Sequence, residues 1–241
     1  MNIEADARRA FDTLKQGGIA ILPMDVGYSL ISGSTGGLDR IFSTKQRAES
    51  KLNAMLGDRE LSLDLHQLDT RQRAIVDAIT EDQDLPLGLI APARMDHPIL
   101  RKMDDRGLSR STRAATVCML LNAGPFHAAI CKLSREEVHP LFGSSANRSM
   151  QGTKFRVEDI EPDVRSIADV VIDYGLRKYH HYAASSTLLD ITTMNVVRVG
   201  SCYELIADLL ARFFKIGLPP DASKRLPTAA PWAQTRQEAR S

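Results

Sequence analysis

Four short polar clusters contain the residues whose chemistry could serve a binding or catalytic site. They are Asp25 with Tyr28, the segment TKQRAESK (44–51), the segment GSSANRS (143–149), and ASSTLLDIT (184–192) together with VVRVG (196–200). The four clusters lie at the ends of predicted strands or in turns, which is where the ligands of open α/β sheets bind. The clusters therefore predict a site that is assembled where several elements end.

The basic segment contributes Lys45, Arg47 and Lys51. Arginine offers a planar fork of donors and lysine a compact charge, and polyphosphates are commonly held by both. A cationic cluster at the end of a helix also complements the helix dipole without binding a ligand. The segment is thus either a phosphate grip or a helix cap.

The two serine-rich clusters have the composition of ordinary turns. Ser145, Asn147 and their neighbours would equally suit a phosphate nest, because glycine and serine let an anion approach the backbone amides closely. Ser186 belongs to the second serine-rich cluster. Arg198 lies in an apolar strand, where a charged side chain needs a partner. That partner is either Asp190 or a ligand phosphate.

Asp25 and Tyr28 directly follow the apolar segment IAILPM. Aspartate favours turns, and tyrosine often shields the end of a strand. From this cluster alone, we interpret Asp25 and Tyr28 as residues that form a turn and shield the end of a strand, with no role in binding.

Helices and apolar strands alternate along the chain. The periodicity predicts helices at 3–16, 37–48, 71–79, 124–133, 158–168 and 203–214, and strands at 19–24, 85–92, 115–121, 141–146, 169–175, 186–192 and 195–200. This alternation indicates one α/β domain over residues 1–214 with a largely buried sheet. The three consecutive late strands indicate that the sheet is partly antiparallel. Residues 215–241 carry four prolines and five basic residues against two acids, which predicts a mostly disordered basic tail.

Composition sets outer limits on function. Of 241 residues, 43% are hydrophobic and 25% charged, with a net charge of +1, as in ordinary globular proteins. Any polyanion-binding surface must therefore be local. The three cysteines (118, 131 and 202) are scattered and form no C-x-x-C, so we expect a reducing, cytoplasmic setting with neither disulfides nor a zinc site. No apolar run approaches the roughly 20 residues that would cross a bilayer.

The order of the clusters carries more information than any one of them. GGIAILPMDVGYSL, KQR, SSANRS, SSTLLD and RVG occur in succession. In this order and at similar separations the chain resembles the YrdC-like family of threonylcarbamoyl-AMP synthases, over roughly residues 8–206. The resemblance implies a twisted mixed sheet with flanking helices around a deep cationic cavity. It also implies that L-threonine, bicarbonate and ATP react, with Mg²⁺ present, to threonylcarbamoyl-AMP and pyrophosphate for the t6A modification of tRNA.

The resemblance also implies roles for individual residues. Lys45 and Arg47 would be the catalytic pair that grips the triphosphate. The other nucleotide-binding residues would be Lys51, Ser145, Asn147, Ser186 and Arg198. Asp25 and Tyr28 would lie near the amino-acid pocket, at the mouth of the cavity. No residue is predicted to ligate a metal.

The chain departs from the family pattern mainly on the amino-acid side. The family strand Val-Gly-Val-Arg-x-Pro appears here as ATVCMLLN, so that its arginine falls near Cys118 or Met119. Arg110 or Arg113, from the preceding basic segment, could reach the vacated position. We therefore expect a synthase, or a divergent paralogue with another acceptor. The alternatives are a non-catalytic protein that binds a nucleotide or double-stranded RNA, and a carbamoyl-transfer module that uses carbamoyl phosphate.

Overall fold

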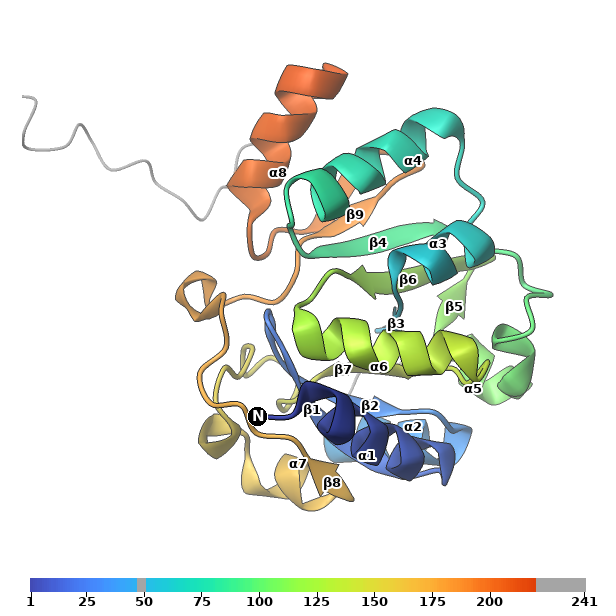
Figure 1. The fold of residues 1–241 in the computed structure, drawn as a ribbon, viewed down its shortest axis with the longest axis vertical. Coiled ribbons are helices and arrows are strands. Elements are labelled where there is room, and N and C mark those ends of the chain that lie inside the picture. The colour runs from blue at the N-terminus through green and yellow to red at the C-terminus, as the bar shows by residue number, and fades with distance from the viewer. Residues whose placement is uncertain (47–50, 220–241) are drawn as a thin grey trace, which may run out of the picture.

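The computed structural model describes residues 1–46 and 51–219 of the chain (Figure 1). Its helices are α1 (Ile3–Lys15), α2 (Thr35–Thr44), α3 (Arg59–Leu65), α4 (Thr70–Asp77), α5 (Asp105–Ser109), α6 (Pro125–Glu136), α7 (Pro162–Ser166) and α8 (Tyr203–Leu209). Its strands are β1 (Ile19–Met24), β2 (Gly27–Ser32), β3 (Ala54–Leu56), β4 (Leu87–Pro92), β5 (Thr112–Arg113), β6 (Thr116–Leu121), β7 (Phe142–Ser145), β8 (Val170–Val171), β9 (Leu188–Asp190) and β10 (Asn195–Arg198). Arg47 and most of the predicted tail lie outside the described residues.

The strands form one mixed sheet in the order β10-β9-β4-β6-β3-β7-β2-β1-β8, with β5 added beside β6. Strands β1 and β8, β3 and β6, and β4 and β9 pair in parallel, and the other pairs are antiparallel. The predicted α/β class with a partly antiparallel sheet is confirmed. The late strands separate, however: β9 and β10 form a hairpin at one edge, and β8 lies at the opposite edge beside β1.

Local sequence signals explain the first helix and strand. Asn2 accepts a hydrogen bond from the Ala5 amide and so caps α1. The helix ends before Gly17, whose φ of +86° suits glycine. The buried residues Phe11 and Leu14 lie on its inner face, as the periodicity predicts. Helix α1 packs beside α6 in front of the sheet (Figure 1).

Strand β2 was not predicted, although it completes a hairpin with β1. Met24 pairs with Gly27 across the two-residue turn. Gly27 has a φ of +110°, and a Cβ there would lie 2.3 Å from the side chain of Thr153. Only glycine fits this turn.

The helix predicted at 158–168 is shorter in the structure. Helix α7 begins only at Pro162, and a separate 3₁₀ turn precedes it.

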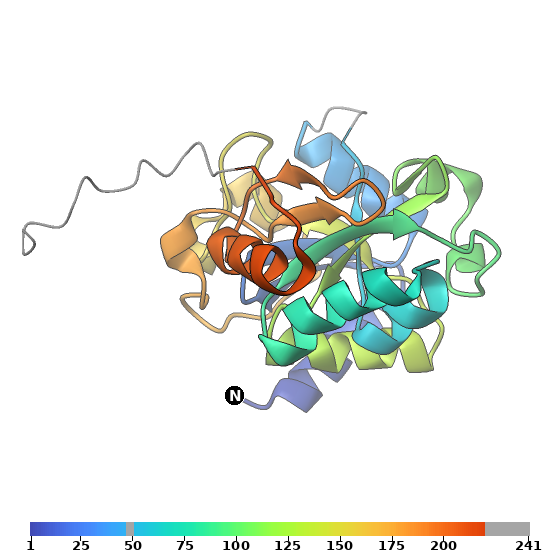
Figure 2. The same ribbon diagram turned by 90° about the horizontal axis from the view of Figure 1, so that it is seen from above.

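The two faces of the central strands have different neighbours. Leu89, Met119 and Leu189 belong to the main core, whereas the residues that alternate with them point to the other face. In Figure 2, viewed from above, the orange β9–β10 hairpin lies on one side of the green strand β4, and α4 and α6 lie on the other. No helix within the described ranges is long and apolar enough to cross a membrane.

Candidate functional site

A cavity of about 720 Å³ opens over the sheet face opposite the main core. A smaller hollow of about 160 Å³ shares several of its lining residues, namely Leu52, Cys118, Ser145, Leu188 and Arg198. The two hollows therefore adjoin and form one cavity. Its walls come from the ends of α2 and β5, the 143–149 segment and strand β10.

Strand register determines which residues form the cavity floor. Ile90 pairs with Cys118 on one side and with Asp190 on the other, and all three line the cavity. Successive residues of a strand point to opposite faces, so Met119 points into the core while Cys118 points into the cavity. The polar residues of the floor are thereby fixed by backbone pairing.

Lys45 joins the second and third sequence clusters. It ends α2, and its side chain is only 2% exposed. Its ammonium group donates to Ser144 Oγ at 2.8 Å and to the Ser145 carbonyl, while its own carbonyl accepts from the Ser149 amide. A buried lysine in this position places a positive charge against the serine-rich segment at the cavity wall.

Asn147 lines the cavity and is 7% exposed. Its side-chain NH₂ group donates to the Arg148 carbonyl, but its Oδ1 has no hydrogen-bond partner among the described residues. A buried acceptor without a partner costs about 1–3 kcal/mol. A donor group on a ligand in the cavity would remove that cost.

Arg198 and Ser186 are joined directly. The guanidinium donates from Nε and Nη2 to the Ser186 carbonyl, at 3.2 and 2.7 Å. None of the ion pairs among the described residues joins Arg198 to Asp190, whose Oδ1 accepts from the amides of Thr192 and Thr193. Partial burial lowers the pKa of Arg198, which nevertheless stays charged at neutral pH.

Two further cations line the cavity, Lys51 and Arg113. Arg113 reaches it from β5, where it pairs with Thr116. Arg110 points elsewhere: its guanidinium forms an ion pair with Asp39 at 3.1 Å and lies 4.1 Å from the Phe42 ring centre. Of the two arginines considered from the sequence, the structure thus places Arg113 at the cavity.

Cys118 puts an uncharged group on the floor. Burial raises the pKa of its thiol to about 11, although nearby Arg198 acts to lower it. The thiol is therefore protonated at neutral pH. The strand segment that lacks the family's arginine accordingly offers no charge to a ligand at this point.

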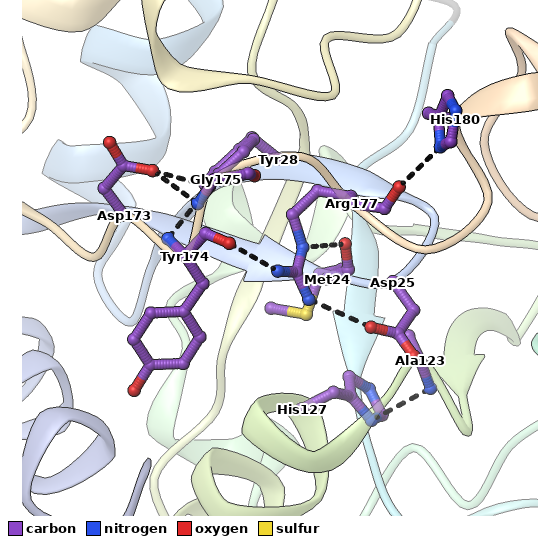
Figure 3. Close-up of polar contacts among 10 residues, drawn as sticks. All are labelled: Met24, Asp25, Tyr28, Ala123, His127, Asp173, Tyr174, Gly175, Arg177 and His180. Atoms are coloured by element: carbon purple, nitrogen blue, oxygen red, sulfur yellow. Dashed lines mark hydrogen bonds and ion pairs between the residues drawn. The ribbon is translucent and has the colours of Figure 1, made fainter. Parts of the chain in front are cut away.

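Asp25 and Tyr28 are not among the residues that line this cavity. Figure 3 shows their polar contacts. Asp25 occupies the β1–β2 turn and forms an ion pair with Arg177. Tyr28 is fully buried; its hydroxyl lies 2.9 Å from Asp173 Oδ1 and accepts from the Tyr174 amide at 3.0 Å. Asp25 instead lines a separate hollow of about 300 Å³. Their contribution to amino-acid binding stays a prediction.

Arg177 was not identified from the sequence. Figure 3 shows its guanidinium between the turn and the 173–177 segment, where it donates to the Met24 and Tyr174 carbonyls and to Asp25. It fixes the position of the turn. No local pattern marks it, because its partners are far away in the sequence.

The donor set does not form a protein-built metal centre. Within residues 1–46 and 51–219, no group of three or more His, Cys, Asp or Glu side chains could hold a metal ion. Asp190 is the one carboxylate among the described lining residues, beside four cationic side chains.

The fold is that of a mixed α/β protein, with a cavity lined by four cationic side chains of the described residues over one face of its sheet. The family model Sua5_yciO_yrdC, described as telomere recombination, matches residues 12–200. The chain therefore belongs to the Sua5/YciO/YrdC family. No curated protein matches it.

Several solved structures share the fold. The hypothetical protein smu.1377c from Streptococcus mutans UA159 is 23% identical, with a TM-score of 0.73 over 88% of this chain and 93% of that one. P. abyssi Sua5 complexed with L-threonine is 20% identical, with a TM-score of 0.71 over 94% of this chain and 63% of Sua5. E. coli YciO is 17% identical, with a TM-score of 0.61 over 82% of this chain and 90% of YciO. This chain thus spans less than two thirds of the length of Sua5.

Proposed function

We propose that this chain is an ATP-dependent carbamoyl-adenylate synthase whose acceptor is an amino acid. L-threonine is the first candidate, and a divergent paralogue would use another amino acid. The convergence of Lys45, Asn147 and Arg198 on one cavity, in a member of this family, is the observation that carries the proposal. The P. abyssi Sua5 structure, which is complexed with L-threonine, supports an amino acid as the acceptor.

The proposed reaction balances without an added reductant or nucleophilic side chain. The acceptor amine attacks bicarbonate, and a carbamate and water form. A carbamate oxygen then attacks the α-phosphorus of ATP, the bond to the β-phosphate oxygen breaks, and pyrophosphate leaves. With threonine the product is threonylcarbamoyl-AMP, which would serve the t6A modification of tRNA.

Catalysis would come mainly from positioning and from neutralising charge. Arg198, with Ser186 and Ser145, would bind the nucleotide, and Asn147 Oδ1 would accept from one of its hydroxyl or amino groups. Lys45, aided by Lys51, would stabilise the pyrophosphate as negative charge develops on it. Arg47, which lies outside the described residues, is assigned with Lys45 on the resemblance.

Magnesium would enter with the nucleotide. Mg²⁺ keeps several waters and is usually held by one or two carboxylates together with substrate phosphates. Because the described lining residues include just one carboxylate and no group of side chains that could hold a metal ion, the ligands of such an ion would be phosphate oxygens and water. When bound, it would neutralise charge on the phosphates.

Pyrophosphate release tests the proposal. Purified protein is given MgATP, with bicarbonate and L-threonine added or omitted singly. We expect release only when both are present. Release that depends on a different amino acid would identify the paralogue. Absence of release with every amino acid, despite measurable ATP binding, would contradict the proposal.

The described surface gives no comparable support for double-stranded RNA binding. Many of its arginines form ion pairs with carboxylates, among them Arg8–Glu137, Arg40–Asp169, Arg59–Asp77, Arg94–Asp64, Arg135–Asp58 and Arg148–Asp163. Nucleic-acid binding relies on Lys and Arg side chains that neutralise phosphates and thereby release the counterions of the nucleic acid, so arginines that are already paired with carboxylates weaken that alternative. The carbamoyl-transfer alternative would appear in the same assay as turnover with carbamoyl phosphate in place of bicarbonate and amino acid.

A further inference from the structure

Asp190 and Arg113 lie on opposite sides of the cavity floor. Asp190 on β9 pairs with Ile90 on β4, Ile90 pairs with Cys118 on β6, and Arg113 on β5 pairs with Thr116 on β6. Strand β5 adds to the side of β6 away from β4. Three strand spacings, about 14 Å, therefore separate the two residues across the sheet, and the step from Cys118 to Thr116 adds about 7 Å along β6, so that their backbones lie about 16 Å apart.

Asp190 is held in one orientation. Its Oδ1 accepts from the Thr192 amide at 2.9 Å and from the Thr193 amide at 3.3 Å, which makes it the first residue of the β9–β10 turn. None of the ion pairs within the described chain involves Asp190, and Arg198 donates to the Ser186 carbonyl instead. The carboxylate is thus fixed, and no described cation is paired with it.

A fixed carboxylate in a phosphate-binding cavity repels phosphate. Its presence indicates that this end of the cavity faces a cationic or donor-bearing part of a ligand. The floor between the two charges is uncharged, because it consists of Ile90 and the protonated Cys118 thiol. A small carbon centre that carries an ammonium at one end and a carboxylate at the other matches this arrangement.

We propose that Asp190 binds the amino group and Arg113 the carboxylate of the amino-acid acceptor. This inference rests on the proposed function, for which it names the residues that recognise the acceptor. It assigns the acceptor carboxylate to β5, the strand next to β6. The long side chain of Arg113 would extend from β5 over the part of the floor where Cys118 carries no charge.

Calorimetric binding of L-threonine, with the cavity saturated by α,β-methylene-ATP, tests the proposal without turnover. Asp190→Asn keeps an oxygen for the two turn amides and removes only the charge. Asp190→Asn and Arg113→Gln should each weaken threonine binding at least tenfold. Asp208→Asn and Arg212→Gln, which alter an exposed ion pair on the C-terminal helical segment, are the matched controls and should change nothing. Unchanged thermal melting would show that each variant is folded.

Truncated ligands make the assignment specific. Threoninol lacks the carboxylate, so its binding should be insensitive to Arg113→Gln but weakened by Asp190→Asn. Conversely, 3-hydroxybutyrate lacks the amine and should be weakened only by Arg113→Gln. Equal losses for all three ligands, or none, would overturn the inference.

Two other results would also overturn it. If Asp190→Asn weakens binding of the ATP analogue only when Mg²⁺ is present, Asp190 is a metal ligand. If none of threonine, serine, glycine or lysine binds to the wild-type protein, the acceptor site does not exist as described. Pyrophosphate release by the wild-type protein is measured separately, so a synthase with a differently built acceptor site would still be recognised.

Discussion

Arg177 Nη2 lies 2.9 Å from Asp25 Oδ1, and the two side chains are only 11% and 10% exposed. The pair joins residues that are 152 positions apart in the sequence. It anchors the 173–177 segment on the β1–β2 turn, as Figure 3 shows. Because the partner charge is buried too, losing one member should cost far more than losing a surface ion pair.

We therefore predict that Arg177→Met lowers the free energy of unfolding by about 3–5 kcal/mol, since it leaves a buried carboxylate unpaired. Urea denaturation measures the loss. The double variant Arg177→Met/Asp25→Asn should recover much of it, because no unpaired charge then remains. A single variant as stable as the wild type would show that the pair contributes little.

The loss in Arg177→Met should also depend on pH. Burial raises the pKa of Asp25 above its ordinary 3.8, and Arg177 opposes that rise. A carboxyl group whose pKa is raised by folding binds its proton more tightly in the folded state, so its contribution to stability falls as pH rises through the interval above 3.8. Without Arg177 the pKa rises further. The difference in unfolding free energy between wild type and variant should thus grow between pH 4 and pH 8, and a constant difference would contradict this.

Tyr28→Phe separates a structural role from a binding role. The hydroxyl contacts Asp173, the Tyr174 amide and the Gly175 carbonyl, so its removal should cost about 1–3 kcal/mol of stability. Burial raises the pKa of this hydroxyl to about 12, so the cost should be the same from pH 6 to pH 9. The KM for ATP and for the acceptor should not change. A raised KM for the acceptor would instead support the amino-acid-binding role predicted from the sequence.

Arg198→Gln should weaken ATP binding by roughly 10- to 100-fold, which corresponds to the loss of a charge-assisted hydrogen bond of about 1.5–3 kcal/mol. Calorimetry at two salt concentrations measures it, and the salt dependence should be shallower in the variant. Arg212→Gln serves as the control, because Arg212 pairs with Asp208 outside the cavity. Equal ATP affinity in the two variants would remove Arg198 from the nucleotide site.

The cysteines should react slowly with iodoacetamide. With a thiol pKa of about 11, Cys118 is ionised to only about a thousandth at pH 8, roughly 200-fold less than an ordinary thiol. Burial also raises the pKa of Cys131 and Cys202. Mass spectrometry after alkylation at pH 8, with Cys118→Ala to assign the site, checks this. Rapid labelling of Cys118 would show that its thiol is ionised in the cavity.

The sequence was informative where the signal is local. The period of α1 and the apolar run of β1 predicted both elements closely, and the order of the motifs pointed to the family. Strand β3 was missed because three residues show no period. That Cys118 points into the cavity follows from the pairing of β6 with β4. The spacing of residues along β6 alone does not reveal this pairing. Arg177 was missed for the same reason, since its partner is brought to it only by the fold.

The most direct test of the central claim is to follow ¹³C-bicarbonate into the nucleotide product. The protein is incubated with MgATP, L-threonine and labelled bicarbonate, and the products are analysed at once by mass spectrometry. The proposed reaction predicts an AMP adduct with the mass of threonylcarbamoyl-AMP, carrying the label, in amounts equal to the pyrophosphate released. Nucleotide products without the label, or no reaction despite ATP binding, would contradict it.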